Sequence, residues 1–158
     1  MTKKTFYDSL VKRIADSATY KGRLILKAKD VEWHVSPQGR NAAIVDSTTG
    51  IDAKCFGIVL TEIPPGGQSG LHKHSFEVAG YVLEGHGYEM VGNERVEWEA
   101  GDTFYLPPNV AHRHFNSDPD KRARLLQVEA WPLAIYLGTA NLEQLEDAKI
   151  TSSESNKK

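Results

Sequence analysis

The sequence has little cysteine, no long apolar run and almost no excess charge of either sign. Its 158 residues include one cysteine, Cys55, so the chain itself can form neither an internal disulfide nor a thiolate cluster. No stretch approaches the roughly 18 apolar residues of a membrane span, and no apolar leader segment follows Met1. With 19 basic and 21 acidic residues, the net charge is −2 and no basic patch suited to nucleic acid or anionic lipid stands out. We therefore expect a cytoplasmic protein that acts on a small molecule, with Cys55 as a small buried strand residue.

Short β-rich runs separated by Gly, Pro, Asn and Asp fill the central hundred residues. The runs are 23–28, 31–35, 42–46, 53–63, 70–74, 78–84, 86–91, 94–98, 103–106, 111–116 and 122–131. Gly92-Asn93 predicts a tight hairpin turn. Many short strands without helical periodicity between them indicate an all-β sandwich or barrel.

The two ends of the chain differ from this central part. Phe6, Leu10, Val11 and Ile14 recur at helical spacing and predict a short amphipathic helix within an N-terminal arm, residues 1–20. One barrel domain is expected over 21–137, followed by a short helix over 138–150. Residues 151–158 lack apolar side chains and are expected to form a disordered tail.

Four of the six histidines stand in two pairs, His72 with His74 and His112 with His114. Side chains at i and i+2 of a strand point to the same face. Two imidazoles side by side, with a third from a neighbouring strand, could hold one divalent ion at three points. Imidazole suits iron, zinc, copper and nickel and is a poor ligand for calcium or magnesium.

Other polar residues allow two interpretations each. His114 shares the face of His112, so it is either a base close to the metal or an interior histidine held by a hydrogen bond. Gln127 and Glu129 share one face of an apolar run, which either lines a cavity or lies outside. His86 is expected to be solvated, and the spacing assigns nothing to His34. Tyr81, Tyr88 and Tyr105 either reach a pocket or serve packing.

The two histidine motifs resemble the paired signature of the cupin superfamily, of the form G-x5-H-x-H-x3-4-E-x6-G and G-x5-P-x-G-x2-H-x3-N. In the second motif Gly101, Pro107, His112 and Asn116 match, and Asn109 replaces a glycine. Asn tolerates the left-handed backbone conformation that such a turn uses. In the first motif His72, His74 and Gly85 match. The resemblance implies a double-stranded β-helix (a jelly-roll barrel) with short N- and C-terminal helices.

The first motif departs from the family at its glutamate ligand. Aligned without gaps, that position falls on Val78, and Glu77 lies one residue early. A shift of one residue on a strand sends a side chain to the opposite face. Either a shorter turn or a bulge re-aims Glu77 as a fourth ligand or base, or the site is a neutral set of His72, His74 and His112 walled by Val78.

The three-histidine form resembles iron(II) sites of gentisate-type and diketone-cleaving dioxygenases. It implies a mononuclear Fe(II) enzyme acting on an oxygen-chelating organic acid or phenol, with His114 or Glu77 handling protons. A redox-neutral isomerase, lyase or decarboxylase using zinc, nickel or manganese is the alternative. A non-catalytic ligand-binding protein and the small subunit of a larger dioxygenase are further alternatives. The family also implies a homodimer, with an arm from residues 21–50 exchanged between partners.

Overall fold

The computed structural model describes residues 5–17 and 20–148. Helices are α1 (Phe6–Ser17) and α2 (Trp131–Leu137), with short 3-10 turns η1 (Ala28–Asp30) and η2 (Ser47–Thr49). The strands in these ranges are β1 (His34–Ser36), β2 (Gly39–Val45), β3 (Gly57–Ile63), β4 (Leu71–His74), β5 (Val78–Glu84), β6 (His86–Val91), β7 (Glu94–Glu99), β8 (Thr103–Leu106), β9 (His112–Asn116), β10 (Ala123–Glu129) and β11 (Leu142–Glu146).

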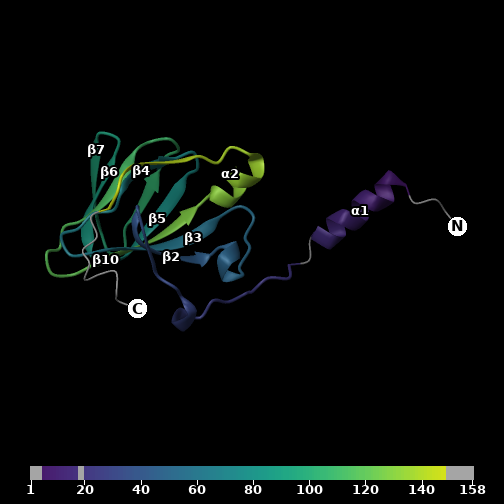
Figure 1. Ribbon diagram of the computed structural model, residues 1–158, viewed down its shortest axis with the longest axis horizontal. Coiled ribbons are helices and arrows are strands. Elements are labelled where there is room, and N and C mark those ends of the chain that lie inside the picture. Colours follow the sequence, from purple (N-terminus) through teal and green to yellow (C-terminus); the bar gives the residue numbers. More distant parts are fainter. Residues whose placement is uncertain (1–4, 18–19, 149–158) are drawn as a thin grey trace.

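Two antiparallel sheets face each other and enclose the interior (Figure 1). One has the order β1-β2-β3-β10-β5-β8 and the other β11-β4-β9-β6-β7. The chain crosses between the sheets repeatedly, as the non-consecutive neighbours show. This is the double-stranded β-helix that the sequence predicted. Helix α1 stands apart from the barrel in Figure 1 and has no buried residue.

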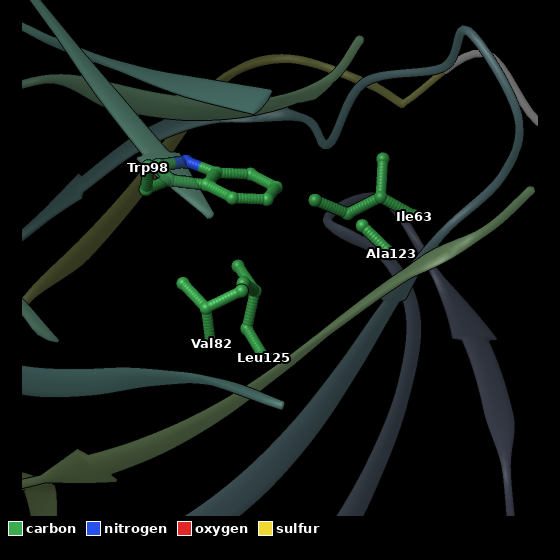
Figure 2. Close-up of a cluster of buried hydrophobic side chains, with 5 residues drawn as sticks. All are labelled: Ile63, Val82, Trp98, Ala123 and Leu125. Carbon is green, nitrogen blue, oxygen red and sulfur yellow. The ribbon is translucent and has the colours of Figure 1, made fainter. Parts of the chain in front are cut away.

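Five side chains from the two sheets form a hydrophobic core inside the barrel. Ile63, Val82, Ala123 and Leu125 come from β3, β5 and β10, and Trp98 reaches them from β7 in the opposite sheet (Figure 2). Val82, Ala123 and Leu125 are fully buried. Each large apolar side chain buried in this way contributes roughly 1.5–3 kcal/mol of hydrophobic stabilisation. The core thus holds the two sheets together.

Turn residues act where the sequence predicts them. Val91 pairs with Glu94 around Gly92-Asn93, and Gly92 has a φ of 60°. Asn109 is the non-glycine residue with a positive φ, 64°, among the described residues. Both the hairpin and the substitution of asparagine for glycine in the second motif are therefore confirmed.

The expected helix over 138–150 is wrong for the part that the structure describes. A helix occurs earlier, with Pro132 in its first turn and Gly138 in the left-handed conformation as its C-cap. Residues Leu142–Glu146 then form β11, which pairs with β4. The hydrogen bonds that this segment makes with the otherwise unpaired backbone of β4 outweigh its local preference for a helix.

Two other expectations made from the sequence are wrong. Cys55 is exposed, because β10 ends at Glu129 opposite Gly57 and leaves no partner for residues 53–56. Residues 23–28 form no strand and lead into η1. The expected tail at 151–158 lies outside the described residues. No helix in the described ranges is long and apolar enough to cross a membrane.

Candidate metal centre

Three histidines from two neighbouring strands meet inside the barrel. His72 and His74 lie on β4 and His112 on β9, and His72 is the register partner of His112. The ring centroid of His112 is 4.4 Å from that of His72 and 4.8 Å from that of His74. One nitrogen of each ring lies within 4.8 Å of the others. The spacing of the two motifs therefore produces one cluster of three nitrogen donors.

A backbone carbonyl fixes the tautomer of each ring. Nδ1 of His72 lies 3.1 Å from the carbonyl oxygen of Gly70, Nδ1 of His74 lies 2.6 Å from that of Phe76, and Nδ1 of His112 lies 2.9 Å from that of Val110. A carbonyl only accepts, so each Nδ1 carries the hydrogen and each Nε2 keeps its lone pair.

The free lone pair on Nε2 of His112 indicates the kind of ligand that the three histidines can bind. Nε2 of His112 is buried and has no hydrogen-bond partner within the described part of the chain. A buried polar atom without a partner is costly unless something binds it. Rings oriented by carbonyls through the other nitrogen are typical of metal-binding histidines. The cluster thus has the donor set of a divalent metal site.

Burial keeps the three rings neutral. Loss of hydration lowers the pKa of His72 to about 4 and that of His112 to about 2, and it also lowers the pKa of His74. A proton competes with a metal ion for the same nitrogen. Near neutral pH these nitrogens are therefore free of protons and available as ligands.

A backbone hydrogen bond joins the two motifs. The N–H of Asn109 donates to the carbonyl oxygen of His74 at 2.7 Å, so the left-handed turn brings the loop before His112 against β4. Asn116 closes the same strand by donating through Nδ2 to the carbonyls of Ile63, Pro64 and Lys121 at 2.8–3.2 Å. The conformational roles of both asparagines follow from the motif, and neither is a ligand.

Glu77 does not join the histidines. It is exposed, and its Oε2 accepts a hydrogen bond from the hydroxyl of Tyr105 at 3.0 Å. Val78 is fully buried and begins β5. No bulge re-aims Glu77, so the ordinary alternation of a strand puts it outside the barrel. The arrangement is the neutral three-histidine one, with Val78 on the inner face.

His114 is buried beside the cluster and is bound to a carboxylate. Its Nδ1 lies 2.6 Å from Glu89, and the side chains of both are almost inaccessible, at 3% and 1% exposure. Glu89 is the register partner of His114 across β6 and β9. Nε2 of His114 is 3.3 Å from Nε2 of Gln127. The structure agrees with the interior histidine held by a hydrogen bond, and His114 also lines the cavity.

His72, His74 and His114 line a cavity of about 350 Å³. Gln127 and Glu129 line it, which decides between their two interpretations in favour of the inner face. Thr61 donates to Oε1 of Gln127 at 2.5 Å and belongs to the same wall. Sequence reasoning missed Glu89 and Trp131. The signal for Glu89 was its position in the alternation of β6, on the same face as the buried Gly87 and the partly buried Val91.

The remaining candidates lie elsewhere. His86 is exposed, and His34 is exposed at the rim of the cavity. Tyr88 stacks on Phe115, and Tyr81 and Tyr105 are exposed. A second cavity of about 370 Å³ contains none of the three histidines and is lined by charges that pair with one another, including Arg40 with Glu62.

Fold and site together define a double-stranded β-helix with a three-histidine cluster inside. Residues 59–129 match the family model of the cupin domain. Over these residues, a little under half of its length, the chain resembles a cupin domain.

Two relatives share short segments with the chain. It is 42% identical over 52 residues to an uncharacterized protein of Methanocaldococcus jannaschii, a match that covers 32% of this chain and 42% of the relative. It is 39% identical over 62 residues to a gentisate 1,2-dioxygenase of Haloferax, covering 39% of this chain and 16% of the relative. The chain therefore spans less than half the length of each of these relatives.

Solved structures share the fold at low identity. A salicylate 1,2-dioxygenase from Pseudaminobacter salicylatoxidans superposes with a TM-score of 0.60 at 22% identity, over 72% of this chain and 32% of that one. The polyketide cyclase RemF from Streptomyces resistomycificus gives a TM-score of 0.61 at 18% identity, over 82% and 88%. Oxalate decarboxylase from Bacillus subtilis gives 0.59 at 18%, over 71% and 30%. At these identities the likeness supports the fold alone.

Proposed function

We propose that the protein is a metal-dependent oxidoreductase of the mononuclear iron(II) dioxygenase type. Its substrate would be a small phenol or organic acid that chelates the metal through oxygen. The observation that carries the proposal is the set of three buried, neutral histidines with no carboxylate among them. Imidazole suits iron, and three neutral ligands leave both the charge of the ion and several of its positions available to an oxygen chelator. The partial likeness to a gentisate 1,2-dioxygenase agrees with this choice.

In this proposal His72, His74 and His112 hold the ion through Nε2. The bound ion would supply Lewis acidity and redox chemistry. His114 lines the cavity and takes a proton from a substrate hydroxyl, and Glu89 stabilises the imidazolium that results. Gln127 orients His114 through Nε2. Val78 and Phe76 exclude water from the ligand side of the cluster because both are buried.

Oxygen uptake tests the reaction. Protein purified without oxygen and loaded with iron(II) would be mixed with catechols, gentisate, salicylate, β-diketones and hydroxy acids in an oxygen-electrode cell. Uptake is expected with at least one chelator, and it should disappear in His112→Ala and persist in the exposed control His86→Ala. Substrate conversion without oxygen uptake, in zinc, nickel or manganese protein, would contradict the proposal and favour a redox-neutral reaction. That alternative drew its support from Glu77 as a fourth ligand, and Glu77 lies outside the cluster. If no chelator were converted under any of these metals, a ligand-binding role would replace the enzymatic one.

We also propose that the protein forms a homodimer through the outer face of the six-stranded sheet. This face carries two cross-strand rows. Leu126 pairs with Leu60 and Tyr81, and beside them Val128 pairs with Ile58 and Ala79. The second row continues to the exposed Tyr105.

Outer faces of antiparallel sheets are usually polar, so an apolar pair of rows indicates a contact surface. Two copies can bring the same flat face together about a two-fold axis as packed sheets. Light scattering behind a sizing column is expected to give a dimer for the wild type and a monomer for Tyr81→Lys/Val128→Lys. A monomeric wild-type protein would contradict the proposal.

A further inference from the structure

The described residues that line the cavity beside the histidines carry no ammonium or guanidinium group. Neither lysine nor arginine is among them. The two cations on the histidine strands, Lys73 and Arg113, point to the opposite face. They pair with Glu143 and Glu146 of β11 at 2.8 Å each. A ligand that brought a free carboxylate into this cavity would therefore find no lysine or arginine as a partner.

The cavity does contain a carboxylate that has no hydrogen-bond or ion-pair partner among the described residues, although the charge of the nearby His114 acts on it. Glu129 is half-buried, and its carboxylate makes no hydrogen bond or ion pair with any residue that the structure describes. Glu129 is the register partner of Gly57 and Val78. Burial raises the pKa of its carboxyl to about 7. A buried acid without a partner is stabilised when a hydrogen-bond donor or a cation binds it.

An aromatic ring stands next to this acid. The absent side chain of Gly57 leaves room for Trp131, because a Cβ at that position would lie 1.9 Å from its ring. Trp131 also lines the cavity. The face of an indole attracts an ammonium group, and a carboxylate close by adds to that attraction. Glu129 and Trp131 together form a wall suited to a positive or hydrogen-bond-donating group.

We propose that the cavity selects phenolic chelators whose remaining substituent is an ammonium or a neutral donor, with Glu129 as the residue that accepts it, and discriminates against aromatic acids. The inference rests on the proposed function only in taking this cavity as the place where the ligand binds. It decides between the two substrate kinds, phenol and organic acid, that the three histidines leave open. Glu129 is in this account a specificity-determining residue.

Three catechols with the same chelating group and the same two-carbon arm test the proposal. They are dopamine, which ends in an ammonium, 4-ethylcatechol, which is neutral, and dihydrocaffeate, which ends in a carboxylate. Calorimetric titration of zinc-loaded and metal-free protein without oxygen gives a dissociation constant for each and involves no turnover. Because the three compounds differ only in the group at the end of the arm, the ratio of their dissociation constants measures the interaction of that group with the wall around Glu129. The chelating end contributes equally to all three.

In the wild-type protein dopamine is expected to bind at least about tenfold more tightly than dihydrocaffeate. The ammonium of dopamine is attracted by the partly buried carboxylate of Glu129, whereas the carboxylate of dihydrocaffeate is repelled by it. Glu129→Gln should bring this ratio close to one. Glu77→Gln, which removes an exposed carboxylate on the outer side of β5, should leave it unchanged. Tighter binding of dihydrocaffeate, an unchanged ratio in Glu129→Gln, or binding of none of the three would each overturn the inference.

Elemental analysis of the same samples separates this inference from the proposed function. Protein that takes up no metal but keeps the charge preference in its metal-free form would contradict the metal-dependent function and support the role of Glu129. Protein that holds metal but lacks the charge preference would support the metal-dependent function and contradict the role of Glu129.

Discussion

The stability of the metal-free protein should fall between about pH 7 and about pH 5 because His72 and His112 are buried as neutral rings. In the unfolded chain each has the ordinary pKa of 6.5, whereas in the fold burial lowers it to about 4 and about 2. The unfolded state therefore binds protons in this window that the folded state does not, and stability decreases as pH falls. From pH 6.5 to pH 5 is about 1.5 units, which at about 1.4 kcal/mol per unit gives roughly 2 kcal/mol for each histidine.

Glu129 acts in the opposite direction over the same window. Its pKa is raised from 4.5 to about 7, so the folded state takes up a proton first and gains stability as pH falls. The most informative measurement is therefore the difference between two proteins in how much their unfolding free energy changes with pH. In urea unfolding with a chelator present, the loss of stability from about pH 7 to about pH 5 should be roughly 4 kcal/mol smaller in His72→Leu/His112→Leu than in the wild type. His86→Leu, which removes an exposed imidazole, is the control and should keep the wild-type pH dependence. Equal pH dependence in the double variant and the wild type would refute the reasoning.

Two further changes test the interior. Glu89→Leu removes the buried acceptor of Nδ1 of His114 and should lower the unfolding free energy by about 3 kcal/mol. The double variant Glu89→Leu/His114→Leu should recover part of this loss, because both polar partners are then gone. A double variant less stable than Glu89→Leu would contradict this. Gly57→Ala forces a Cβ against the ring of Trp131 and should cost about 1–3 kcal/mol and shift the tryptophan fluorescence, whereas unchanged stability and emission would contradict the close packing.

Local patterns were sufficient for most strands and for the shared face of His72 and His74. The third histidine of the cluster, His112, meets them through the pairing of β4 with β9, which the two motifs together implied. The expected runs 78–84 and 86–91 coincide with β5 and β6. His72 and His74 share a face by the two-residue period alone, and Asn109 adopts the left-handed turn that the second motif requires. These features depend on neighbours in the sequence, so the sequence predicted them directly.

Features that depend on pairing between distant strands were missed. Glu89 meets His114 only through the register of β6 against β9. The segment 142–146 becomes a strand only because β4 offers an unpaired edge. The sequence allowed Glu77 to point either toward the histidines or away from them. Without a bulge at the start of β5, it points away. Local preference carries none of this information.

Metal content tests the central claim most directly. Elemental analysis would be made on wild-type protein purified without oxygen, on His72→Ala/His112→Ala, and on His86→Ala as the control. We predict close to one iron per chain in the wild type and in His86→Ala, and loss of the metal in the double variant. Stoichiometric zinc, nickel or manganese would contradict the assignment of iron and leave the site intact. Equal metal in the double variant, or none in any protein after reconstitution, would contradict the three-histidine centre itself.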